Sequence, residues 1–139
     1  MIVRAGIAVL AALNAWWGLW ARFDPRGFFD SFPGFGHHWT AGYQPYNEHL
    51  VTDLGSTFLT LAVLLAAAAI MDDGRVRAVV LGGTLVFNGL HLAFHVSDRG
   101  TLGDLDAWLS VATLAVGVLG PAALLGLDVW SRRDRRSDG

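Results

Sequence analysis

Residues 48–95, EHLVTDLGSTFLTLAVLLAAAAIMDDGRVRAVVLGGTLVFNGLHLAFH, decide the fold. Two apolar runs, 50–70 and 76–95, lie on either side of a polar turn that extends from Asp72 to Arg75. Each run has about the 20 residues that an α-helix needs to cross a bilayer. Because so short a connection makes consecutive helices antiparallel neighbours, the stretch predicts a pair of adjacent membrane-spanning helices.

Two further apolar runs, 2–20 and 105–127, flank this pair. Only 16% of the residues are charged, which is well below the roughly 25% of soluble domains. The four runs together predict an all-α fold, a four-helix transmembrane bundle that forms a single domain over residues 1–130. Arg4 before an apolar run also fits a cleaved signal peptide. That run ends in three tryptophans, which is typical of a membrane interface, and we interpret it as a retained helix.

The arginines set the expected orientation, since the chain has no lysine. With a cytoplasmic N-terminus, the inner side holds Arg4, Arg75, Arg77, Arg132, Arg133, Arg135 and Arg136, and the outer side holds Arg22, Arg26 and Arg99. This excess on the inner side follows the positive-inside rule. We therefore expect a multi-pass protein of the plasma membrane with both termini in the cytoplasm. The basic tail, residues 131–139, is expected to be disordered.

In this topology residues 21–47 form a long extracytoplasmic loop between the first two helices. Asp24 and Pro25 predict the start of a short helix within it. Five phenylalanines give the loop an aromatic-rich face: Phe23, Phe28, Phe29, Phe32 and Phe35. We interpret the loop either as a lid that carries His37 and His38 over a site or as an amphipathic helix bound to the membrane surface.

Ionisable side chains gather at the outer ends of the two central helices. His49 and Asp53 are four residues apart near the start of one helix, and His91 and His95 are four residues apart at the end of the next. This spacing places both members of a pair on one helix face. Counting about 1.5 Å per residue outward from the turn puts the two pairs at similar depths. All five histidines of the chain therefore fall in one zone at the outer face.

A metal site is the first interpretation of this zone, because imidazoles and carboxylates at a membrane are costly unless they pair or bind something. The expected metal ligands are His49, Asp53, His91, His95, His37 and His38. Glu48 is expected to act as the catalytic base or as a further ligand. Histidine-rich ligation without cysteine suits copper or zinc, with iron as a further option. We expect a metal-binding protein and, if it is an enzyme, a metal-dependent oxidoreductase or a zinc hydrolase.

Two other functions are consistent with the same residues. A b-type haem would lie between facing histidines, with His49 and either His91 or His95 as axial ligands, and a quinone-linked redox protein is a related option. Without a cofactor, the cluster would serve a proton relay, a transporter or an accessory membrane subunit. The expected partners are the lipid bilayer, a small or lipophilic substrate and a second copy of the chain. The short tail, in which arginine alternates with aspartate, does not support nucleic-acid binding.

Three motifs carry a resemblance to a known group of proteins. They are Asp30-Ser31-Phe32-Pro33-Gly34, Pro45-Tyr46-Asn47-Glu48-His49-Leu50 followed by Asp53-Leu54-Gly55, and His91-Leu92-x-x-His95. In these motifs and through most of its length the chain resembles small actinobacterial four-helix membrane proteins of the DoxX-like and DUF4345-like group. The resemblance implies the four-helix membrane fold and points to the same histidines and acids, and it implies no activity.

The orientation can be tested in intact cells. A labelling reagent that does not cross the membrane should reach residues near Trp39 and should fail to reach the arginine tail, because the topology places them on opposite sides of the membrane. The reverse labelling pattern would contradict the assignment of the inner face.

Overall fold

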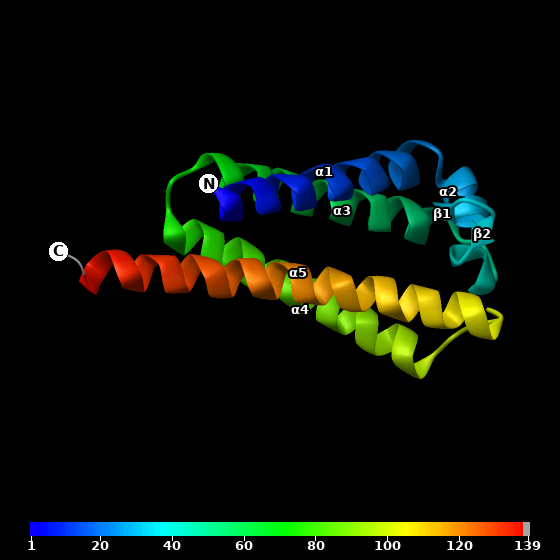
Figure 1. Cartoon of the computed structure of the whole chain (residues 1–139). Helices are drawn as coiled ribbons and strands as arrows, with labels where there is room; N and C mark the ends of the chain where they lie inside the picture. The colour runs from blue at the N-terminus through cyan, green and yellow to red at the C-terminus, as the bar shows by residue number, and fades with distance from the viewer. Residues whose placement is uncertain (138–139) are drawn as a thin grey trace.

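The chain is helical, and the computed structural model describes its residues 1–137 (Figure 1). The elements, in chain order, are α1 (Ile2–Phe23), α2 (Pro25–Ser31), β1 (Pro33–Gly34), β2 (His37–His38), the 3-10 helix η1 (Thr40–Gly42), α3 (Glu48–Ile70), α4 (Gly74–Ser97) and α5 (Asp104–Ser137). The two short strands pair with each other in antiparallel fashion.

Four of these helices are long and apolar enough to cross a membrane: α1, α3, α4 and the Asp104–Asp134 part of α5. Few of their large apolar side chains are buried, and many lie exposed on the surface of the chain, where lipid would cover them. The helical fold and the four predicted long apolar helices are therefore confirmed, and their length and composition support a membrane protein. Figure 1 shows that α1 begins and α5 ends at the same end of the molecule. The type of membrane and the cytoplasmic position of the termini stay predictions.

Side-chain caps begin three of the helices. The carboxylate of Asp24 accepts a hydrogen bond from the backbone N–H of Gly27 at 2.9 Å, and this bond starts α2. The carboxylate of Asp73 accepts a hydrogen bond from the N–H of Arg75 at 2.7 Å and starts α4. The side-chain oxygen of Asn47 accepts one from the N–H of Leu50 at 3.2 Å and starts α3. Such caps satisfy N–H groups that have no partner inside the helix. The predicted helix start at Asp24 and the polar turn before α4 are confirmed.

The long helices form two pairs, α1 with α3 and α4 with α5 (Figure 1). Glycines bring the first pair close together. A Cβ atom on Gly55 of α3 would lie 2.6 Å from the backbone nitrogen of Arg22, and one on Gly18 of α1 would lie 2.9 Å from that of Leu59. Since real side chains do not approach so closely, only glycine allows the two backbones to pack at this distance.

The second pair is joined by polar contacts. In the middle of the helices, the side-chain amide of Asn88 donates a hydrogen bond to the carbonyl oxygen of Gly117 at 2.7 Å. At the turn end, which we define as the end that holds the Asp72–Gly74 turn and the start of α1, Arg77 of α4 binds Asp128 of α5.

The two pairs pack on each other mainly near the turn end. The buried core there consists of Ile7, Ala11, Leu65, Ala68 and Leu81. From this core the pairs diverge, so that α3 begins and α4 ends on opposite sides of the first turns of α5 in Figure 1. The turn does make α3 and α4 consecutive antiparallel helices, as predicted, but each helix packs more extensively on a different partner.

The segment between the first two spans is folded, and the long loop that the sequence predicted there is not what the structure shows. Residues 24–47 contain α2, the strand pair and η1; we call this segment the cap and the end that it covers the capped end. Phe28 and Phe29 are buried. The Phe28 ring packs at 5.4 Å from Trp20 and at 4.7 Å from Phe32. The five phenylalanines predicted to share one aromatic face thus divide. Phe23 and Phe35 are exposed, Phe28 and Phe32 pack on Trp20 of α1, and Phe29 packs on Tyr46 within the cap.

The basic tail also differs from expectation within the described residues, because α5 continues through Ser137. The side chains of Ser131 and Arg132 donate hydrogen bonds to the carbonyl oxygen of Asp128. These bonds link the first residues of the tail to the preceding turn of α5. Disorder was therefore the wrong expectation for residues 131–137.

A buried ion pair links α4 and α5 at the turn end. Nε of Arg77 donates to Oδ1 of Asp128 at 2.7 Å, and the two side chains are only 6% and 3% exposed. The other carboxylate oxygen, Oδ2, lies 2.9 Å from Nη2 of Arg132, at ion-pair distance but without hydrogen-bond alignment. Arg77 also contacts Asp72, whose side chain is 84% exposed.

Replacing Asp128 by asparagine should lower the free energy of unfolding by about 3–5 kcal/mol, because the charge of Arg77 then stays buried without its partner. Asp72→Asn is the matched control and should cost less than about 1 kcal/mol, since its ion pair is exposed on the Asp72 side. Denaturant titration of the purified protein in one detergent measures both values. Equal losses would show that the buried pair contributes no more than the exposed one.

Candidate functional site at the capped end

The structure places all five histidines at the capped end, as predicted, but in separate contacts. His37 and His38 belong to the cap, His49 lies in the first turn of α3, and His91 and His95 lie in the last turns of α4.

His49 and Asp53 contact each other as their spacing predicts. Nε2 of His49 lies 3.2 Å from Oδ2 of Asp53, and the side chains are 81% and 62% exposed. Glu48, the first residue of α3, is exposed as well. Exposure of this degree means that the two side chains face away from the bundle. The expected approach of this pair to the α4 histidines is therefore not seen.

His91 and His95 form the second pair, with ring centroids 4.8 Å apart and ring planes inclined by 22°. Aromatic rings surround them: Phe87 lies 5.8 Å from His91, and Tyr43 of the cap lies edge-on to His95 at 5.0 Å. Both histidines are partly buried. Two stacked imidazoles between aromatic rings make this the best enclosed group of histidines in the described chain.

The hydroxyl group of Tyr43 fixes the orientation of His95. It donates its single hydrogen to the carbonyl oxygen of Asp98 at 2.9 Å, because a carbonyl can only accept. Its second contact, to Nδ1 of His95 at 2.8 Å, must then be a bond that the imidazole N–H donates. In the neutral ring this leaves the lone pair on Nε2, so His95 can accept a proton or bind a metal ion there.

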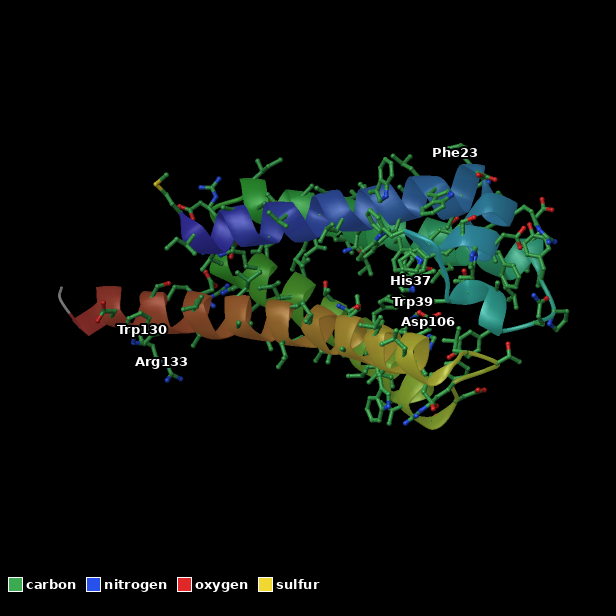
Figure 2. All side chains as sticks on the ribbon, turned by 45° about the vertical axis from the view of Figure 1, so that its right-hand side comes forward. Phe23, His37, Trp39, Asp106, Trp130 and Arg133 are labelled. Atoms are coloured by element: carbon green, nitrogen blue, oxygen red, sulfur yellow. The ribbon has the colours of Figure 1, made fainter. Side chains whose placement is uncertain are left out.

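The two histidines of the cap are also held through Nδ1. Nδ1 of His37 lies 2.6 Å from Oδ1 of Asp106 in α5, and the indole N–H of Trp39 donates to that oxygen at 3.2 Å. Figure 2 shows these three side chains together between the cap and α5. Nδ1 of His38 lies 2.6 Å from the carbonyl oxygen of Asp30. Each of these contacts occupies Nδ1 and leaves Nε2 as the free ring nitrogen, an arrangement that is usual for histidines that bind metals.

Backbone contacts also join the cap to the connection between α4 and α5. The carbonyl oxygen of Gly42 accepts hydrogen bonds from the N–H of Thr101 at 2.9 Å and from its hydroxyl at 3.1 Å. Gly100 packs directly against this carbonyl, and its φ of 55° is a conformation that glycine adopts without strain. Together with Tyr43 and His37, these contacts hold the cap on the second helix pair.

A complete metal centre is not assembled from these side chains. In the described part of the chain, no three His, Asp or Glu side chains group closely enough to hold an ion. The predicted ligands are divided among the α3 pair (His49 and Asp53), the α4 pair (His91 and His95) and the cap (His37 and His38). Glu48 is exposed in the first turn of α3. A haem between His49 and an α4 histidine would require two rings that face each other, whereas the α3 pair and the α4 pair lie in separate contacts. The metal and haem sites therefore stay predictions.

Sequence reasoning missed the partners that orient the histidines. Neither Tyr43 nor Asp106 is among the site residues predicted from the sequence. Both contacts join segments more than 50 residues apart, at separations of 52 and 69 residues. Spacing rules for helices reach only to neighbouring turns, so no local signal could have identified them.

Replacing Tyr43 by phenylalanine should cost about 1 kcal/mol of stability, because it removes a hydroxyl that makes two hydrogen bonds. Burial, and then the nearby Asp98 carboxylate, raise the pKa of Tyr43 above its ordinary 10.0. The unfolded chain therefore loses this proton first, and stability should fall as the pH rises above 10.0. Denaturant titration across that range should show that the free energy of unfolding falls less steeply with pH in the variant, where Tyr46 is the one remaining tyrosine. An equally steep fall in the variant and the wild type would contradict this role of Tyr43.

No family model matches the chain, and no curated protein and no solved structure matches it either. The resemblance to the DoxX-like and DUF4345-like group thus stays a prediction.

Proposed function

We propose that this chain is an integral membrane protein that binds a divalent transition-metal ion, copper or zinc, through His91 and His95 at the capped end. The observation that carries the proposal is the stacked pair itself, whose ring centroids are 4.8 Å apart. Two histidines one helical turn apart are a recurring way to bind one ion from a single helix. Imidazole nitrogen suits both metals.

The surroundings of the pair support this assignment. Tyr43 holds His95 through Nδ1 and leaves Nε2 for the ion. Among the described residues His91 makes no side-chain hydrogen bond, so its ring is free to turn until its nitrogen also reaches the ion. A zinc–nitrogen bond is about 2.0–2.1 Å long, so binding requires the His91 ring to turn out of its stacked position until its nitrogen points at the ion held by His95.

Two protein ligands leave the remaining positions of the ion to water or to a small molecule. An open position is the property that distinguishes catalytic from structural zinc sites. The partly exposed pair lies at the end of a span, where both water and lipophilic molecules from the bilayer have access. We therefore place His37, His38, His49, Asp53 and Glu48 outside the ion's immediate surroundings.

The test is a titration of the metal-free, detergent-purified protein with Cu²⁺, followed by electron paramagnetic resonance. We expect one Cu²⁺ per chain with nitrogen ligands. His91→Ala and His95→Ala should each abolish this tight binding, and Tyr43→Phe should weaken it by about 10- to 100-fold, as the loss of an orienting partner does at other metal sites. His38→Ala is the matched control and should bind Cu²⁺ like the wild type.

Binding that survives the loss of His91 and His95, or that falls equally in His38→Ala, would overturn the proposal. The absorption spectrum of the protein as isolated decides the haem alternative, because a bound haem gives an intense Soret band. A Soret band would show that the protein binds haem and would overturn the proposed two-histidine metal site.

A further inference from the structure

The surface of α3 that faces away from α1 carries a regular stripe. Its members are His49, Asp53, Ser56, Thr60, Val63, Ala67 and Ile70, and we call them the α3 seam. Their spacing alternates between four and three residues along the whole helix. All are exposed except Ala67, which is partly buried. A period of 3.5 residues is the pattern of two helices that pack along their full length with a left-handed twist.

No described element covers the seam. The buried residues of α3, Gly55, Ala62, Leu65 and Ala68, lie on the other side of the helix. Val63 and Ile70 remain 69% and 73% exposed, and the side chain of His49 at the other end is 81% exposed. The seam therefore forms a continuous free surface from one end of the span to the other.

Lipid alone is a poor cover for this surface. The other exposed faces of the spans carry large apolar side chains, such as Val86 and Leu90 on α4 and Leu119 on α5. The seam carries an imidazole, a carboxylate, two hydroxyls and an alanine beside its apolar residues Val63 and Ile70. The hydroxyls of Ser56 and Thr60 each donate to a carbonyl oxygen one turn earlier in α3. Polar and small side chains on a spanning helix are typical of contacts between helices, because they allow close approach and hydrogen bonding.

We propose that the α3 seam pairs with the same seam of a second copy of this chain, in parallel, about a two-fold axis along the membrane normal. Two copies inserted in the same direction place each seam residue opposite itself. Ser56, Thr60 and Ala67 then meet their own copies and let the two helices approach closely.

Charge complementarity favours a second copy as the occupant. His49 and Asp53 are one turn apart on the seam and 3.2 Å from each other. In a parallel pair, each His49 packs between the Asp53 carboxylates of both chains, so that two imidazoles and two carboxylates alternate around the axis. The inference does not depend on the metal site, which lies on a different helix.

The chain has no cysteine, so single cysteines report on this contact without interference. We would introduce Ser56→Cys, Thr60→Cys or Val63→Cys and oxidise the protein in its native membrane. Each variant should give a disulfide-linked dimer. Val86→Cys is the matched control, because it is 64% exposed and lies near the middle of α4, as Thr60 does in α3. It should give little or no dimer.

A second measurement tests the polar end of the seam. Asp53→Asn should raise the dissociation constant of the dimer by about threefold to tenfold, the range found for polar contacts between membrane helices. Elution of the variants as folded, monodisperse protein shows that the changes act on association. Equal cross-linking of the seam and the control, no cross-linking at any seam position, or cross-linking of Thr60→Cys to a different protein would each overturn the proposal.

Discussion

The close contact between α1 and α3 at Gly18 and Gly55 is the constraint on which the rest of the structure depends. Two backbones meet there at a distance that no larger residue permits. Van der Waals contact of this kind is a main source of helix association in a bilayer, where apolar side chains gain nothing by leaving lipid for protein. Once α3 is held against α1 along its length, it cannot also follow α4 to the capped end.

This constraint separates the two histidine pairs. Counting residues from the turn places both pairs toward the capped ends of α3 and α4, but distance along a helix is only one coordinate. His49 and Asp53 face outward from the first helix pair, while His91 and His95 lie on the second pair against Tyr43. The turn-end core and the Arg77–Asp128 ion pair fix the opposite end, so the separation is built into the packing of the bundle.

The sequence was sufficient for what local physics controls. Apolar length identified the four spans, and Asp24 and the turn before α4 located helix starts, because a cap acts within one turn. It was not sufficient for the cap, which was predicted as a long loop and is a folded segment with Phe28 and Phe29 buried. Burial there depends on Trp20 and on residues of other helices, and the same holds for the partners of His37 and His95. The pairing of α1 with α3 depends on Gly18 and Gly55. The sequence alone does not distinguish these two from the other glycines of the apolar helices, so it could not predict the pairing.

The contacts of the cap have a consequence for biosynthesis. The cap is made from residues translated before α3, but Asp98, Thr101 and Asp106, which hold it, are among the residues translated after most of α4. The cap can form its aromatic contacts with α1 early, since chains begin to fold from the N-terminus during synthesis. It can close on the second helix pair only after α4 and the first turn of α5 have been made. The surroundings of His95 are therefore among the last parts of the molecule to reach their final form.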